Sequence, residues 1–207
     1  MRINTLLIVT SILAGCATQN ASKLITTNDL HEKGLVIVSL TQSGTPGGDM
    51  SSSAYYESAD GRVKGHISTN AARLPLGLYK GDFKNTQGEL SYFELPQGLY
   101  KFTGWSYAAG SVVIRSKEMN PYYFEIKQGE TIYIGDIHVN AVMGNNIFGM
   151  PIASSGSISI NDSSERDLNL FSSLVPGIDK GNIKTRVMEA KENTGSQDRQ
   201  IIPMLFK

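Results

Sequence analysis

The sequence has one cysteine, three histidines and no excess of either charge. A single cysteine excludes an internal disulfide. Lys plus Arg and Asp plus Glu each number 19 among the 207 residues, so no net field attracts a polyanion by long-range steering. We therefore expect no nucleic-acid partner.

The sequence also lacks the local motifs of common catalytic mechanisms. It contains no His-Glu-x-x-His pair, no Gly-x-Ser-x-Gly elbow and no Gly-x-x-x-x-Gly-Lys-Ser/Thr phosphate loop. The glycines of residues 44–49 follow a different spacing and are more typical of a mobile loop than of a phosphate cradle. These absences predict a non-catalytic protein without a cofactor.

Two polar pairs offer alternatives to that prediction. Asp136 and His138 are two positions apart on a predicted strand and would point to one face as metal ligands. A structural zinc site needs four ligands and a catalytic site three, so a polar pair at a sheet edge is the simpler interpretation. Glu94 and Glu125 would suit the acid–base pair of a glycosidase, although carboxylates on strands are more often solvated. We predict neither a metal site nor a catalytic residue.

The N-terminus has the layout of an export signal. Met1-Arg2 supplies a positive start, and an apolar stretch runs from Leu6 to Leu13. This stretch is too short to span a bilayer as a permanent helix, and small residues follow it at Ala14-Gly15 before Cys16. The pattern predicts a cleavable signal peptide over residues 1–15.

Leu13-Ala14-Gly15-Cys16 resembles the lipobox of bacterial lipoproteins. The resemblance implies that the Cys16 sulfur receives a diacylglyceryl group, that cleavage occurs just before it, and that the new amino end is acylated. The alternative is an ordinary export signal with an incidental cysteine. Two or three acyl chains make membrane residence stable, and Ala17 in place of aspartate implies the outer membrane. We expect a lipid-anchored protein facing the periplasm.

The mature chain is predicted to hold one β-rich domain. Residues 16–33 lack an apolar period and are interpreted as a flexible lipidated tether, residues 34–188 as the domain, and residues 189–207 as a polar, partly flexible C-terminal segment. Aromatic and β-branched residues in short runs, with 21 glycines, favour many strands joined by turns. The predicted fold class is mainly β: an antiparallel β-sandwich with one short C-terminal helix.

Individual strands show different patterns. Residues 35–40 form a continuous apolar run, typical of a central strand that is covered on both faces. Asp60-Gly61 predicts a hairpin between residues 53–57 and 62–67. In residues 99–107, alternation places Tyr100 and Phe102 on one face and Leu99, Trp105 and Tyr107 on the other. In residues 130–139, either both faces are covered or a bulge at Gly135 switches the register.

Two segments near the C-terminus combine apolar and turn-forming residues. Residues 141–156 predict either a long hairpin whose apolar side packs on the core or an exposed contact patch that includes Phe148 and Met150. Residues 164–167 match a capping box, and Leu168 and Phe171 lie on one apolar face of the helix that it would begin. That helix should end before Pro176.

Residues 34–175 resemble, in the order of their motifs, a group of Gram-negative envelope lipoproteins with no assigned activity. The matching stretches are residues 94–100, 133–138, 147–150 and 166–168, with Phe171. The turn of residues 95–100, Leu-Pro-x-Gly-x-Tyr, is also similar to turns in transthyretin-like and carboxypeptidase-regulatory-like sandwiches. The resemblance implies a β-sandwich on a lipid tether and transfers no catalytic residue.

Three functions are compatible with these features. The first is a binding or structural module that contacts another envelope protein; its candidate contact residues are Phe148, Met150, Trp105 and Tyr107. The second is a glycan- or small-molecule-binding domain, or a hydrolase, that uses aromatic residues such as Tyr100, Trp105, Tyr107, Tyr122 and Tyr123. The third is an accessory subunit of an envelope assembly or secretion machine. In each case the membrane is a partner through the acyl chains on Cys16.

Overall fold

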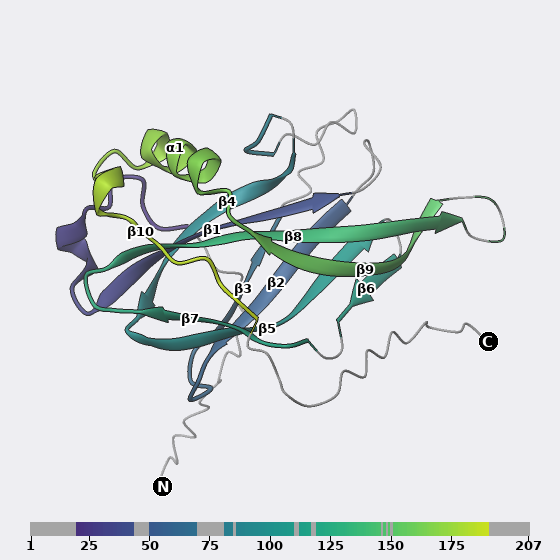
Figure 1. The fold of residues 1–207 in the computed structure, drawn as a ribbon, viewed down its shortest axis with the longest axis horizontal. Helices are drawn as coiled ribbons and strands as arrows, with labels where there is room; N and C mark the ends of the chain where they lie inside the picture. Colours follow the sequence, from purple (N-terminus) through teal and green to yellow (C-terminus); the bar gives the residue numbers. More distant parts are fainter. Residues whose placement is uncertain are drawn as a thin grey trace, which may run out of the picture.

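A computed structural model shows two stacked β-sheets with one helix on the outer face of the first sheet (Figure 1). It describes residues 20–43, 50–69, 81–84, 86–109, 112–116, 119–145, 147, 149 and 151–190. The strands are β1 (Lys33–Ser43), β2 (Met50–Ser58), β3 (Lys64–Ser68), β4 (Gln87–Pro96), β5 (Gly98–Ala109), β6 (Val112–Arg115), β7 (Tyr122–Ile126), β8 (Thr131–Asn145), β9 (Pro151–Asn161) and β10 (Lys184–Thr185). The helical elements are α1 (Ser164–Leu174) and the 3-10 turns η1 (Thr27–Leu30) and η2 (Lys180–Asn182).

The mainly-β sandwich prediction is confirmed, with one topological feature that the sequence did not predict. The first sheet has the order β10-β8-β1-β4, with β9 beside the second half of β8, and the second has the order β3-β2-β5-β6, with β7 beside β5. Both β1 and β10 pair with β8 in parallel, so the first sheet is mixed rather than antiparallel. A parallel pair requires a long crossover, here the whole chain from β2 to β7, and no local pattern reveals it.

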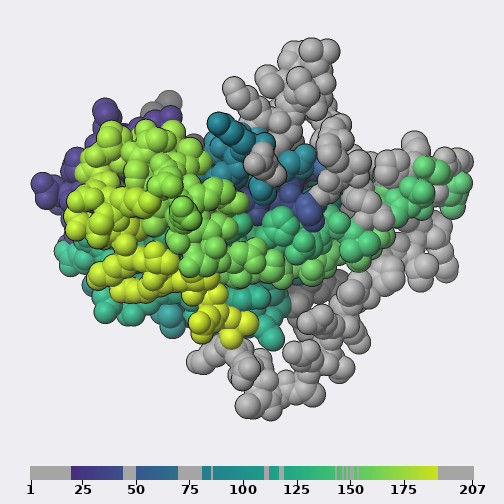
Figure 2. All heavy atoms as spheres, turned by 45° about the horizontal axis from the view of Figure 1, so that its top comes forward, coloured from purple at the N-terminus to yellow at the C-terminus, as the bar shows by residue number. Residues whose placement is uncertain are grey.

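Strand β1 is central and buried on both faces, as predicted. Val36 and Val38 point into the core between the two sheets, which we call the inter-sheet core. Leu35 and Ile37 point to the other face of the first sheet, where α1 and flanking segments form a second cluster, the outer layer. Figure 2 shows α1 and the segment after it as one continuous layer over this side of the molecule.

The ordered domain begins earlier than the predicted boundary at Gly34. Ala21 donates a backbone hydrogen bond to the Tyr92 carbonyl (2.7 Å), which places the chain along the outer edge of β4. Ile25 and Leu30 are both buried in the outer layer. Residues 20–33 are therefore part of the domain rather than a flexible tether, because two spaced apolar side chains suffice to dock a segment that has no sustained period.

A bulge in β5 changes the predicted distribution of its aromatic residues. Tyr55 and Tyr56 of β2 pair with Gly104 and Phe102, so Thr103 is an extra residue in β5. The extra residue reverses the alternation beyond it. Trp105 and Tyr107 therefore face the same inter-sheet core as Tyr100 and Phe102, and the prediction that they share the opposite face is wrong.

Both alternatives given for residues 130–139 hold in β8. A bulge is present at Gly135, and Tyr133 is buried on the face opposite Ile132 and Ile134. The parallel register with β1 shifts between Tyr133 and Asp136, and Gly135 has φ 115°. Gly135 packs closely against Ile160 of β9, because a Cβ added at Gly135 would lie 3.0 Å from a methyl carbon of Ile160. The bulge keeps four apolar residues of β8 on the inter-sheet side: Ile132, Ile134, Ile137 and Val139.

The turn named above within residues 95–100 is present, but it joins two sheets rather than two paired strands. Strand β4 pairs with β1, whereas β5 pairs with β2 in the second sheet. Tyr100 fixes this corner by donating a hydrogen bond from its hydroxyl to the Pro96 carbonyl (2.9 Å). A tyrosine that closes a sheet-to-sheet corner in this way is a recurrent device of β-sandwiches. Among the described residues, no helix has the length and apolarity to cross a bilayer.

Candidate functional site

The predicted site residues divide into buried residues and residues that the structure does not describe. Cys16, Phe148 and Met150 lie outside the described residues. Trp105 and Tyr107 are only 6% and 0% exposed. The Trp105 ring is covered by Gly156 of β9, where an added Cβ would lie 2.7 Å from a ring carbon. Trp105 and Tyr107 are therefore core residues, and their assignment to a contact surface is wrong.

Asp136 and His138 do not contact each other directly; the Thr41 hydroxyl lies between them and is hydrogen-bonded to both. Thr41 Oγ1 lies 2.7 Å from Asp136 Oδ1 and 2.7 Å from His138 Nδ1. The hydroxyl has one hydrogen and donates it to the carboxylate, so His138 donates its Nδ1 hydrogen to Thr41. No group of three or more His, Cys, Asp or Glu side chains suited to a metal occurs among the described residues.

The most developed polar cluster surrounds Asp167, at the start of α1. The Asp167 carboxylate is fully buried. It accepts hydrogen bonds from Ser39 Oγ (2.5 Å), Tyr133 OH (2.7 Å) and Arg166 Nε (2.7 Å). The Arg166 guanidinium also lies 3.2 Å from Asp136 Oδ2, so one cation bridges two buried carboxylates. We call Ser39, Tyr133, Asp136, Arg166 and Asp167 the carboxylate cluster.

The surroundings of this cluster raise the pKa of two of its groups. Burial raises the pKa of the Tyr133 phenol, and the adjacent Asp167 charge raises it further. Burial alone would lower the pKa of Arg166, but the hydrogen bond and charge of Asp167 and the charge of Asp136 outweigh it and raise that pKa. The guanidinium also lies 4.1 Å from the centre of the Phe83 ring, a cation–π contact. The cluster thus fastens α1 to the first sheet.

Sequence reasoning missed this cluster because it interpreted Asp167 locally. In the predicted capping box, Ser164 would cap the helix and Asp167 would return a hydrogen bond to it. In the structure Ser163 is the N-cap residue, Ser164 is already helical, and Asp167 points into the protein. The capping-box prediction is therefore wrong, whereas the end of the helix before Pro176 is confirmed.

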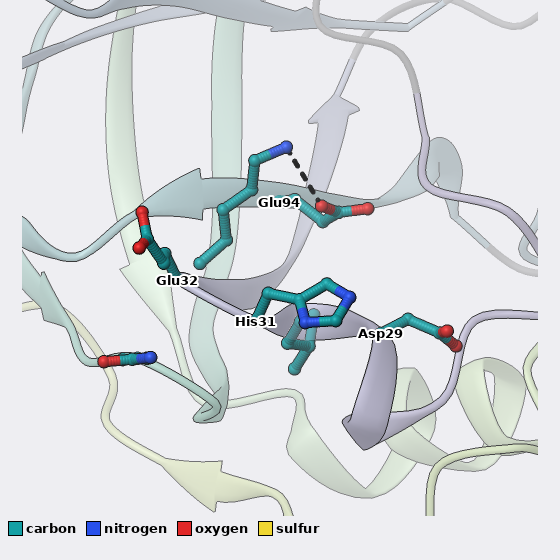
Figure 3. A pocket seen from close by; sticks show the side chains of 7 residues that line it. Asp29, His31, Glu32 and Glu94 are labelled. Carbon is teal, nitrogen blue, oxygen red and sulfur yellow. Dashed lines mark hydrogen bonds and ion pairs between the residues drawn. The ribbon is translucent and has the colours of Figure 1, made fainter.

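A shallow hollow of about 540 Å³ lies where η1 leads into β1 (Figure 3). Its lining is mostly charged or polar: Asp29, Leu30, His31, Glu32, Lys33, Glu94 and Gln128. Glu94 is paired with Lys33 (3.2 Å), and Glu125 is exposed on β7 in the other sheet, so the proposed acid–base pair does not form. Ligand pockets are usually lined by apolar and aromatic groups, and this hollow has no Tyr, Trp or Phe.

The hairpin predicted over residues 141–156 is present as the β8–β9 ribbon. The ladder between β8 and β9 continues to Asn145 and Pro151, whereas β1 accompanies β8 only as far as Asn140. The ribbon therefore projects past the sheet, as Figure 1 shows. Its base packs on the inter-sheet core through Ala141, but Val142 and Ile147 are 55% and 92% exposed. The first predicted alternative, a hairpin that packs on the core, applies to the base of the ribbon. The second, an exposed apolar surface, applies to its outer part.

Comparisons with known proteins add no family. No family model matches the chain, and no curated protein matches it. A crystal structure of a leucine-rich repeat protein from Bacteroides thetaiotaomicron is similar over 52% of this chain, with 15% identity and a TM-score of 0.30. The match spans 14% of that protein's length, and a likeness of this size carries no argument about fold or function.

Proposed function

We propose that the chain is a lipid-anchored outer-membrane lipoprotein whose non-catalytic β-sandwich acts as a binding or structural module of the envelope. The observation that carries the proposal is the lipobox ending at Cys16, four residues before Asn20, whose side chain is hydrogen-bonded to β4. An anchor at this position needs no further membrane-binding element, because two or three acyl chains hold a protein stably on a bilayer.

A protein partner is favoured over a glycan. Stacking on a sugar needs exposed aromatic faces. Of the candidate aromatic residues, Tyr100, Trp105 and Tyr107 are buried in the inter-sheet core, and Tyr122 and Tyr123 on β7 are half-buried. The projecting β8–β9 ribbon instead exposes the aliphatic side chains of Val142 and Ile147. Exposed apolar side chains on a projecting element are typical of protein contacts, which fits a structural module or an accessory subunit of an envelope assembly.

The anchor is tested by Cys16→Ser in the full precursor. We expect the variant to lose labelling by a fatty-acid probe and to leave the membrane fraction, because no thiol remains to be acylated. A variant at an exposed position, Leu99→Ser, serves as the control and should keep both properties. Membrane retention of unlabelled Cys16→Ser protein would contradict the proposal that acylation holds the protein there.

The binding role is tested by placing a photo-crosslinking residue at Ile147 in intact cells. Leu99 is the matched control, because it is also an exposed aliphatic residue (46%) but lies on β5, away from the ribbon. We expect a discrete crosslinked band from position 147 and none from position 99. Equal, diffuse crosslinking from both positions would argue against the ribbon as a contact site.

A further inference from the structure

Residues 20 and 21 are fastened to the outer edge of β4. Asn20 accepts a hydrogen bond from the Tyr92 backbone amide at its Oδ1 (2.8 Å) and donates one from Nδ2 to the Leu90 carbonyl (3.4 Å). The Ala21 amide continues this pairing with the Tyr92 carbonyl (2.7 Å). Ile25, shortly afterwards, is buried in the outer layer. Contacts at Ala21 and at Ile25 therefore hold the short turn that lies between these two residues.

The covalent connection from the proposed anchor to this edge is short. Asn20 is the fourth residue after Cys16. A fully extended chain covers at most about 3.6 Å per residue, so the two Cα atoms are within about 14 Å of each other. The polar region of one leaflet is itself about 5–8 Å thick. Once Cys16 is acylated at the acyl boundary, the edge of β4 therefore lies no more than about 6–9 Å beyond the headgroups.

The turn that follows Asn20 exposes a leucine close to the proposed anchor. Ser22 shapes the turn by accepting hydrogen bonds from the Ile25 amide at its carbonyl (3.1 Å) and from the Leu24 amide at its hydroxyl (3.2 Å). Ile25 points inward, whereas Leu24 is 85% exposed and is preceded by exposed Lys23. An apolar side chain beside a lysine suits the boundary between headgroups and acyl chains.

We propose that the turn of residues 20–25 is a second membrane contact, in which Leu24 enters the headgroup region of the bilayer that holds Cys16. This inference rests on the lipidation proposed above. It also orients the domain. Figure 1 shows η1, directly after the turn, and the tip of the β8–β9 ribbon at opposite ends of the long axis. The contact thus leaves Ile147 directed away from the membrane and free to meet a protein.

The test uses the full acylated protein, purified from membranes and reconstituted in vesicles of phosphatidylethanolamine and phosphatidylglycerol. Cys16 is the only cysteine, and acylation blocks its thiol, so an introduced cysteine is labelled alone. Leu24→Cys and Ile147→Cys place a fluorophore at two highly exposed aliphatic positions, 85% and 92%. A lipid-attached quencher then reports the distance of each label from the bilayer.

We expect quenching at position 24 to be several-fold stronger than at position 147. A Gly-Ser linker of about 20 residues inserted between Gln19 and Asn20, which spans about 25 Å on average, should weaken quenching at position 24 strongly. Equally weak quenching at both positions, with acylation intact by mass, would overturn the inference and leave the lipoprotein assignment standing. Equally strong quenching at both would overturn the orientation. Strong quenching that the linker does not change would overturn the role of the short connection. Absence of acylation would overturn both proposals.

Discussion

The two faces of the first sheet are stabilised by different interactions. On the inter-sheet side, the core is aromatic and aliphatic, with Tyr56 stacked on Phe93 and Tyr100 on Phe124, each at a centroid distance of 5.4 Å. On the outer side, Phe171 of α1 packs on Tyr92, and the carboxylate cluster joins the first turn of α1 to the sheet. Both faces thus bury apolar groups, but among the described residues only the outer layer adds a buried cluster of directional, charged hydrogen bonds.

This difference predicts two modes of failure. A substitution that removes apolar contacts from the inter-sheet core should unfold both sheets together, because both sheets contribute side chains to this one cluster. A substitution that removes hydrogen bonds from the carboxylate cluster should first detach α1 and the segments beside it. The first sheet should persist, because the inter-sheet core still supports its other face.

The largest effect is expected for Phe93→Ala. Phe93 is buried and stacked on Tyr56, so truncation leaves a cavity between the sheets and should cost about 4 kcal/mol of unfolding free energy. Urea denaturation followed by circular dichroism measures it. Leu99→Ala, at a position 46% exposed, is the control and should change stability by no more than about 0.5 kcal/mol. A loss of under about 1 kcal/mol for Phe93→Ala would show that the inter-sheet core is not what holds the sandwich.

Asp167→Ala should cost somewhat less, about 3 kcal/mol, because it leaves Arg166 without its nearest carboxylate and removes the shared acceptor of Ser39 and Tyr133. Hydrogen exchange should accelerate in α1 well before it accelerates in β5. Glu165→Ala is the matched control, because Glu165 is an exposed carboxylate in the same first turn of α1. Equal acceleration in α1 and β5 would remove the distinction between the two faces.

Tyr100→Phe tests the one polar bond that we assign to the corner between the sheets. The substitution keeps the buried ring and removes only the hydrogen bond to the Pro96 carbonyl, so a loss of about 1 kcal/mol is expected. Tyr107→Phe is the comparison at another buried tyrosine, and the two variants are measured by the same denaturation experiment. No loss for Tyr100→Phe would mean that packing alone fixes the corner.

The smallest expected effects concern pH. Burial, with the nearby Tyr56 and Asp60, raises the pKa of Tyr100 to about 12, so its contribution to stability is complete below pH 10 and is lost as the pH rises from about 10 to about 12. Burial opposes ionisation of Glu130, but hydrogen bonds from Lys184 and Arg186 outweigh it and lower its pKa. That contribution is present above the ordinary pKa of 4.5 and is lost as the pH falls through the lower folded value.

Tyrosine absorbance and hydrogen exchange across pH measure these changes. Alkali should loosen β5 in the inter-sheet core, whereas acid should first loosen residues 184–186, which Glu130 holds. Loosening of the same segment at both extremes would contradict the comparison between the two faces.

Features fixed by local residues were predictable from the sequence. The apolar run of β1, the Asp60-Gly61 hairpin and the bulge at Gly135 each have a local mark, and the structure contains all three. The bulge at Thr103 is marked only by the Gly104 that follows it, and simple alternation passed over this glycine and placed Trp105 and Tyr107 on the wrong face.

Features set by tertiary contacts were not predictable. Asp167 fits a capping box by spacing, but its partners Ser39 and Tyr133 are distant in sequence and carry no motif. Residues 20–33 have too few apolar positions to predict docking, which depends on backbone pairing with the outer edge of β4 and on burial of Ile25 and Leu30 in the outer layer. The same limit applies to the parallel pairing of β1 with β8.

The most direct test of the lipoprotein assignment is the mass of the N-terminal peptide from protein purified out of the membrane fraction. Trypsin cleaves after Lys23, so the mature chain should yield a peptide of residues 16–23. We predict that this peptide begins at Cys16 and carries a diacylglyceryl group on sulfur and an acyl chain on its amino end. A peptide with unmodified Cys16, or a chain that still begins at Met1, would contradict the account.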